Sequence, residues 1–522
     1  MTKPWLHTLA TLILFGAGLL TYLHSFSNGF VLDDELQIVT NAVVQSPQNI
    51  KAFFLGSTIN NGTSSLSGVY YKPIMTTLYS LLWWWEPGDA FWFHLFQWTI
   101  GFFNALLAYR LFLRFFEPWL ALAGAMIFFI HPINSEVIVY IADLQDVLFT
   151  FFGLLALDRL SRTLCVSWGQ AFMVGGLLLL SLLSKESGAL YVMILPLFAV
   201  IFRLRGALKI GLSCGVSVCV YLWLRVGVAQ LTKLVDTMNQ IGRASWGTRL
   251  LTAPQAMVSY IWKFFYPVSF STTQDWVIES PTWNSFWLPL LGLAAILALS
   301  LVFARRQWQN SGSKDFLFFM IWTVLGFGFH SHIIAPLDGT VADRWFYFTS
   351  LGGLGMLGVV VRHWKVPARH GCILTAMIVL TLSVRSRSRS LDWEDNFTIC
   401  SHDLKVSPNS YDLHNNLGVE LFRRGQIKEA QAEFIRSTEL APYWDINWNN
   451  LGAAYSRLGD LTRAEEYYLR SINNGRYFIA YENYASLLIT QGRLNEAKQF
   501  LDEKALPTFP GSQRLLELRT RL

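Results

Sequence analysis

The feature that most limits how this chain can fold is the recurrence of apolar runs long enough to cross a lipid bilayer. A helix of roughly 17 to 25 apolar residues spans a hydrocarbon core of about 30 Å. The first such run, LHTLATLILFGAGLLTYLH at 6–24, has no small-residue cleavage site after it, so we expect a retained helix rather than a removed signal peptide. Runs of this kind continue to about residue 385, which predicts a mainly helical, polytopic membrane protein.

The composition changes sharply near Asp392. The whole chain is 53% hydrophobic and 15% charged, but charged and amide residues return at ordinary soluble frequency after this point. We therefore expect a membrane domain at 1–390 and a second domain at 391–522. The net charge of +6 lies mainly in short connections between apolar runs, where topology explains it, so we expect no nucleic-acid binding. The five cysteines suggest neither a metal site nor a disulfide framework.

The apolar runs predict about eleven membrane spans. They lie near 6–24, 92–113, 118–134, 137–157, 166–184, 187–203, 208–226, 284–304, 316–336, 344–361 and 370–385. Lys and Arg cluster in alternate connections, which indicates that these connections and the N-terminus are cytoplasmic. An odd number of spans then places the second domain outside, although Arg385, Arg387 and Arg389 contradict the charge rule locally.

Two long connections, about 25–91 and 227–283, fall on the opposite, outer side. Each contains a short aromatic-rich apolar stretch, at 73–85 and at 256–267. These stretches are too short to span a membrane, so we expect helices that lie on the outer surface.

The second domain repeats itself. The pairs Leu417/Leu451 and Gly418/Gly452 recur at the 34-residue period of tetratricopeptide repeats, and a third unit follows with one residue lost. Stacked repeats of this kind predict an α-solenoid with a concave groove that binds protein segments. A passive spacer or assembly surface is an equal alternative at this stage.

Ionisable residues gather at the outer ends of the apolar runs. Asp33, Asp34 and Glu35 follow the first run. The others are His131, Glu136, Asp143, Asp146, Lys185, Glu186, Arg225, His330, His332, Asp338, Asp343 and Arg344. Each alone has an ordinary explanation as a solvated turn or a local ion pair. Together they indicate a polar pocket, because acids and cations at one depth suit a site that binds an anionic head group and activates a hydroxyl.

The order of several motifs resembles the membrane O-mannosyltransferases with tetratricopeptide repeats, which belong to the glycosyltransferases of the GT-C fold that use polyprenyl-phosphate sugars. The matching stretches are FVLDDELQIVTN, YYKPIMTTLYSL, HLFQWTIGFFNALLAYRLF, HPINSEVIVYIADLQDVLFTFFGLLAL, LLSKESGAL and ADRWFYFTSLGGLG. The sequence departs from the family pattern in having no Arg before Asp146 and only about three repeats.

The resemblance implies an inverting transfer of mannose or another hexose from a polyprenyl-phosphate donor to Ser or Thr hydroxyls of proteins. We assign no residue to a metal, and the lipid-linked sugar is the one cosubstrate that the sequence indicates, while metal dependence stays open. It implies Asp34, or else Asp33, as the catalytic base, with Asp34 slightly favoured. The implied ligands of the donor phosphate are, in order, Arg344, Lys185, Lys72 and Arg225. The implied sugar or acceptor pocket comprises His131, Glu136, Asp143, Glu186 and His332. The repeat groove is the expected protein-acceptor site.

Other functions stay open at this stage. The acceptor could be a lipid or a cell-surface glycan, and the membrane part could merely anchor a non-enzymatic scaffold. A transporter is a third alternative, but charges confined to one side favour an enzyme at the membrane face. The short repeat array favours a bacterial inner membrane over the endoplasmic reticulum membrane.

Overall fold

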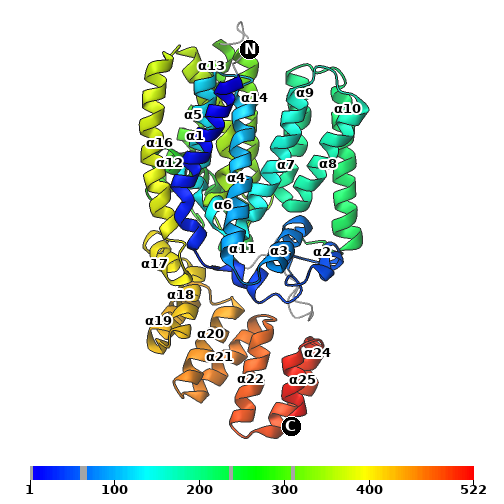
Figure 1. The fold of residues 1–522 in the computed structure, drawn as a ribbon. Coiled ribbons are helices and arrows are strands. Elements are labelled where there is room, and N and C mark those ends of the chain that lie inside the picture. Colours follow the sequence, from blue (N-terminus) through cyan, green and yellow to red (C-terminus); the bar gives the residue numbers. More distant parts are fainter. Residues whose placement is uncertain (1–3, 59–67, 234–238, 307–311) are drawn as a thin grey trace.

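Helices account for the regular structure of the chain in a computed structural model, which describes residues 4–58, 68–233, 239–306 and 312–522. A bundle of long helices forms one end of the molecule and a stack of shorter ones the other (Figure 1). We call residues 4–391 the membrane part and residues 396–522 the repeat part. Helix α1 begins at the end of the bundle that lies farthest from the repeat part (Figure 1).

Every predicted span contains a helix of the membrane part. These helices are α1 (Pro4–Tyr22), α4 (Ala90–Phe112), α5 (Pro118–Ile130), α7 (Leu144–Ser161), α8 (Trp168–Ser184), α9 (Ala189–Ile201), α10 (Ala207–Leu222), α13 (Leu288–Arg306), α14 (Gly312–Phe329), α15 (Phe346–His363) and α16 (Ala368–Leu391). By length and hydropathy alone, five helices among the described residues could cross a membrane, or six with one bent pair. The count of eleven crossings stays a prediction.

The helix boundaries differ from the prediction between residues 118 and 157. Helix α5 ends at Ile130, a 3-10 turn covers Pro132–Asn134, and the short helix α6 (Ser135–Val139) follows at an angle of 52°. A second 3-10 turn, Ile141–Asp143, precedes α7. Pro132 causes the first break, because proline lacks an N–H and disfavours a helical residue before it. These breaks place Glu136 of α6 and Asp143 of the second turn in the interior of the bundle.

Short helices cover the end of the bundle that faces the repeat part. They are α2 (Ile50–Leu55), α3 (Pro73–Trp85) and α11 (Gln240–Arg243), and all three lie between the bundle and the repeats in Figure 1. Helix α3 has the bounds that the sequence predicted. Helix α12 (Trp246–Phe265) begins about ten residues before the predicted stretch 256–267 and ends two residues before its end.

The repeat part consists of paired helices. They are α17 (Asn396–Val406), α18 (Tyr411–Arg423), α19 (Ile427–Leu440), α20 (Asp445–Arg457), α21 (Leu461–Asn474), α22 (Phe478–Thr490), α23 (Leu494–Phe500), α24 (Leu506–Thr508) and α25 (Gln513–Thr520). From α17 to α23 each helix packs on the next one in the chain. The 34-residue period has a steric cause. A Cβ atom on Gly418 would lie 2.5 Å from the ring of Phe434, and one on Gly452 would lie 2.8 Å from Tyr468, so each pair needs a small residue there.

The arginines that contradicted the charge rule serve structural contacts. Arg389, whose side chain is only 2% exposed, forms an ion pair of 2.7 Å with Asp403 of α17. Arg385 and Arg387 donate hydrogen bonds to backbone carbonyls of neighbouring segments. Arg389 therefore joins α16 to the repeat part, whereas Arg385 and Arg387 join it to other segments of the membrane part, so these cations carry little information about topology.

Candidate active site

Asp34 is fully buried, and backbone N–H groups occupy both of its carboxylate oxygens. Oδ2 accepts a hydrogen bond from Val31 N at 3.0 Å, and Oδ1 accepts one from Ala142 N at 2.7 Å. Burial raises the pKa of Asp34 well above its ordinary value, although these two bonds oppose the shift. Asp34 therefore ties the segment after α1 to the turn before α7, which leaves its carboxylate little freedom to bind a substrate.

Asp33 differs from its neighbour because its side chain is open to the surface. Surrounding protein atoms still displace water from the carboxyl and raise its pKa, while the positive charge of Arg344, and to a lesser extent that of Lys72, opposes the rise. A reachable carboxylate with a raised pKa between two cations is what a general base beside an anionic substrate requires. The geometry thus favours Asp33 over Asp34 as the base.

Arg344 lies between two acids of the broken helix segment. Its Nη1 donates to Glu136 Oε1 at 2.7 Å and to the carbonyl of Thr272 at 3.2 Å, and its Nε lies 3.6 Å from Asp143 Oδ1. The side chain remains 21% exposed, whereas the two acids are 3% and 2% exposed. One guanidinium therefore orients both buried acids and still presents an edge to the outside.

Glu136 and Asp143 each keep one buried oxygen without a hydrogen-bond partner in the part of the chain that the structure describes. These atoms are Glu136 Oε2 and Asp143 Oδ2. Burial raises the pKa of Asp143 to about 7, and Arg344 opposes the rise. Buried unpaired carboxylate oxygens are costly. They are suited to accept hydrogen bonds from the hydroxyl groups of a sugar.

Two other predicted phosphate ligands are already paired with acids. Lys185 Nζ contacts both oxygens of Asp146, at 2.7 and 2.6 Å. Arg225 is fully buried, binds Glu186 at 2.7 Å and also donates to backbone carbonyls. Within each pair the acid neutralises the cation. Lys185 and Arg225 therefore hold the loops around the site and offer no free positive charge.

Lys72 differs from the other predicted cations because Glu186 acts on it from a distance rather than as a close ion-pair partner. Its ammonium lies 4.2 Å from the centre of the Tyr70 ring, and it makes no ion pair with any described residue. Burial lowers the pKa of Lys72 to about 8, and Glu186 opposes the shift. Lys72 therefore has positive charge available for an anionic ligand.

The two predicted pocket histidines use their ring nitrogens for backbone contacts. In His131, Nδ1 accepts from Ile133 N and Nε2 lies 2.9 Å from the carbonyl of Phe264. In His332, Nε2 lies 2.8 Å from the carbonyl of Thr340. The structure places both near the site, where they fix the turns on which it is built.

Sequence reasoning missed several charged neighbours. Lys263 of α12 forms a buried ion pair with Asp343, the residue before Arg344. A lone lysine inside an aromatic-rich amphipathic stretch was the available signal. The pKa of Asp412 in α18 is raised to about 7, mainly by burial and also by the nearby negative charge of Asp33. No periodicity in the repeats distinguishes Asp412.

No cluster of three or more metal-binding side chains occurs within the described residues.

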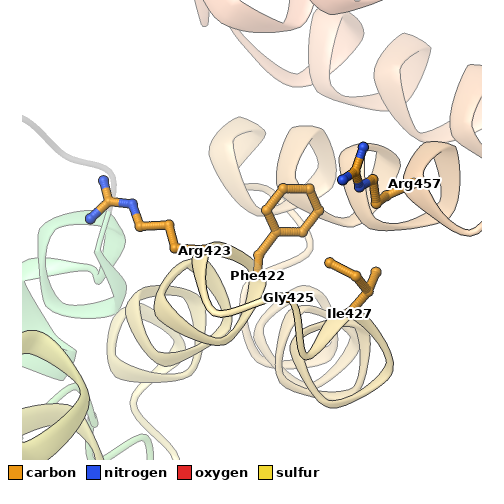
Figure 2. Close-up of a pocket in the computed structure, with 5 residues that line it drawn as sticks. All are labelled: Phe422, Arg423, Gly425, Ile427 and Arg457. Atoms are coloured by element: carbon orange, nitrogen blue, oxygen red, sulfur yellow. The ribbon is translucent and has the colours of Figure 1, made fainter.

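A pocket with a volume of about 470 Å³ lies on the repeat part. It is lined by Phe422, Arg423, Gly425, Ile427 and Arg457. Figure 2 shows the two arginine side chains extending from neighbouring helices on either side of Phe422. Arg423 is paired with Glu35, so Arg457 is the guanidinium of this pocket that could meet an acid of a peptide segment beside an apolar residue.

The chain is similar to named protein O-mannosyl-transferases. It is 24% identical over 455 residues to one of Caenorhabditis elegans, covering 83% of this chain and 63% of the relative. It is 24% identical over 468 residues to protein O-mannosyl-transferase TMTC3 of Homo sapiens, covering 81% of this chain and 50% of the relative. The chain thus spans about half to two thirds of the length of these curated relatives.

Two further similarities concern parts of the fold. The tetratricopeptide repeat model matches residues 447–473, which confirms the predicted repeat over α20 and α21. An oligosaccharyltransferase of Archaeoglobus fulgidus aligns with 80% of this chain and 60% of its own, at 13% identity and a TM-score of 0.39. That likeness is too weak to support an inference about function.

Proposed function

We propose that the chain is a glycosyltransferase that moves a hexose, mannose in the first instance, from a polyprenyl-phosphate donor to Ser or Thr hydroxyls of proteins. The observation that carries the proposal is the reachable Asp33 carboxylate, whose pKa is raised by burial and held down in part by the nearby charges of Arg344 and Lys72. The names of the relatives support the same reaction class.

The chemistry follows from these three residues. The Asp33 carboxylate takes the proton of the acceptor hydroxyl while that oxygen forms a bond to the anomeric carbon of the sugar. The bond from that carbon to the lipid phosphate breaks, and its electron pair stays on the phosphate. Attack opposite the leaving group inverts the anomeric centre. A phosphate is a weak base, so it leaves without a general acid when cations hold it.

Lys72 and Arg344 are the proposed phosphate ligands. Lys72 contributes a charge that no described acid holds in a close ion pair, and the exposed edge of Arg344 contributes N–H donors in the fork geometry that suits phosphate. Glu136 and Asp143, each with an unpartnered oxygen, are the proposed ligands of the sugar hydroxyls. Lys185 and Arg225 take a structural role in this proposal.

The repeat part is the proposed site for the protein acceptor. Its pocket at Phe422 and Arg457 is open to a peptide, and its first helices adjoin the loop that carries Asp33. Helix α1 begins at the end of the bundle farthest from the repeats in Figure 1. This arrangement supports the proposed placement of the N-terminus and the repeats on opposite sides of the membrane. A bacterial inner membrane, with the endoplasmic reticulum as the alternative, stays a prediction.

Purified full-length protein in detergent tests the proposal directly. It should transfer labelled hexose from a synthetic polyprenyl-phosphate donor to a Ser-containing peptide, and NMR of the product should show the anomeric configuration opposite to that of the donor. Transfer to lipid or glycan acceptors but not to any peptide would show that the acceptor is not a protein. Absence of transfer to every acceptor class would overturn the proposal that the chain is a glycosyltransferase.

A further inference from the structure

The first two helices of the repeat part contact the residues on either side of the Asp33–Asp34 pair. Asn396 Oδ1 accepts a hydrogen bond of 2.6 Å from Leu32 N. Arg423 donates two bonds to the carboxylate of Glu35, at 2.7 and 2.6 Å. Leu32 and Glu35 directly flank the acidic pair in the sequence, so the repeat part holds both ends of this segment.

The held segment has a backbone that needs support. Leu32 has a φ of +49°, in the left-handed region that residues other than glycine seldom adopt. Such a conformation persists where surrounding contacts impose it. The bond from Asn396 falls on the N–H of this residue, and Asn396 Nδ2 also donates to Glu35 Oε1 at 3.3 Å. Two residues of the repeat part thus hold the segment at the point where it is strained.

A parallel contact leads from the repeat part to Arg344. Asp403 of α17 accepts a hydrogen bond of 2.7 Å from Thr272 N, and the carbonyl of Thr272 accepts the bond from Arg344 Nη1. Asp403 is itself fixed by Arg389. The repeat part therefore supports the proposed base and one of the proposed phosphate ligands through separate contacts.

We propose that Asn396 and Arg423 are positioning residues, through which the repeat part holds the carboxylate of Asp33 in its reactive place. This inference rests on the proposed function for its catalytic consequence, while the contact itself does not depend on it. The repeats are then a part of the active site as well as a surface for acceptors. Loss of the contacts should lower turnover and leave the donor KM nearly unchanged, because neither residue contacts the donor.

Hydrogen exchange measures the contact without any assay of activity. In the full-length protein, Asn396→Ala/Arg423→Ala should speed amide exchange in peptides from residues 28–45. The single Arg423→Ala variant should speed it by up to about fivefold, because this ion pair is half exposed. The matched control is Arg436→Ala, which removes an exposed pair with Glu439 in the same repeat and touches no residue of the first outer loop. Equal exchange in the double variant and the wild type would overturn the proposal.

Charge reversal separates positioning from loss of structure. Arg423→Glu should lower turnover at constant donor KM, and adding Glu35→Arg should restore a part of it. No rescue together with an unchanged turnover in Arg423→Glu would overturn the positioning role. If the wild type transfers no sugar, the proposed function fails, and the exchange experiment still decides whether the repeat part holds the segment.

Discussion

The two parts of the molecule use charge in opposite ways. In the repeat part, ion pairs such as Arg436–Glu439 join residues one helical turn apart, and their side chains are 45% and 58% exposed. In the membrane part, Glu136 and Asp143 are almost fully buried around Arg344. Exposed pairs cost and contribute little, whereas buried charges carry a desolvation cost of several kcal/mol per ion. The difference teaches that helix stability explains the exposed pairs of the repeats, whereas the buried acids around Arg344, with their unpartnered oxygens, are better explained by a function.

The largest expected effect belongs to Asp33. Asp33→Asn keeps the size of the side chain and removes the base, so turnover should fall by roughly 10²–10⁴-fold. The melting temperature should change little, because the hydroxyl of Tyr140, which bonds the Asp33 carboxylate, can donate equally to the amide oxygen of Asn. Asp34→Asn is the contrast. The side-chain amide of Asn has one oxygen instead of two, so either the N–H of Val31 or that of Ala142 would face the NH₂ group, which is itself a donor. This substitution should therefore lower the melting temperature. If both variants behaved alike, the distinction between the two acids would fail.

Gly418→Val should affect stability and not chemistry. The added Cβ would meet the ring of Phe434, and overpacking of this kind costs about 1–3 kcal/mol. We expect a lower melting temperature, measured by circular dichroism, while the folded fraction transfers sugar at the normal rate. Gly176→Val serves as the control, because no heavy atom lies within 4 Å of its Cβ position. A loss of turnover without a loss of stability would contradict the division between the two parts.

The pH dependence of donor binding should reveal Lys72. Its pKa is lowered to about 8, so the ammonium is charged below pH 8 and loses its charge as the pH rises through that value. Between pH 7 and pH 9 the charged fraction falls about tenfold, and the donor KM should rise by roughly the same factor. Lys72→Arg should remove this alkaline limb, since a guanidinium stays charged. A donor KM that is constant to pH 9 would exclude Lys72 as a phosphate ligand.

Acid should slow the reaction for a different reason. The raised pKa of Asp33 means that its carboxyl gains a proton at a higher pH than an ordinary aspartate, and the protonated form cannot accept the hydroxyl proton. Turnover at saturating donor should therefore fall as the pH drops, while donor KM stays nearly constant. A turnover that rises in acid would contradict a carboxylate base.

The smallest effect is expected at the surface of the repeats. Arg514 pairs with Glu517 at 3.3 Å, and both side chains are about half exposed. Arg514→Ala should change the free energy of unfolding by about 1 kcal/mol or less, with unaltered transfer, because solvent screens exposed pairs. A larger change would show that exposed ion pairs contribute more to the stability of the repeats than their contrast with the buried charges of the membrane part implies.

Apolar run length predicted where the helices of the membrane part lie, because length and hydropathy are local properties. It did not predict the breaks at Pro132 and before α7, since a short turn inside an apolar stretch changes neither property much. The repeat period predicted the close packing at Gly418 because that contact recurs every 34 residues. The role of Arg389 was hidden because its partner Asp403 lies in another helix.

Residue types and sidedness predicted which acids and cations gather at one end of the bundle. They could not rank Asp33 against Asp34, because two adjacent residues differ only in which way each side chain points. They also ranked Arg344, Lys185 and Arg225 without knowing that each pairs with an acid from a distant segment. Pairing across the fold decides which cation is free, and that information arises only after folding.

Chemical rescue of Asp33→Ala tests the central claim most directly. The variant leaves a space where the carboxylate stood, and formate is small enough to enter it and act as the base. We predict that the purified variant transfers almost no sugar alone and that its turnover rises with formate concentration, while Asp33→Asn, which fills the space, shows no such rise. Transfer by Asp33→Ala at the wild-type rate without formate would contradict the assignment of Asp33 as the base.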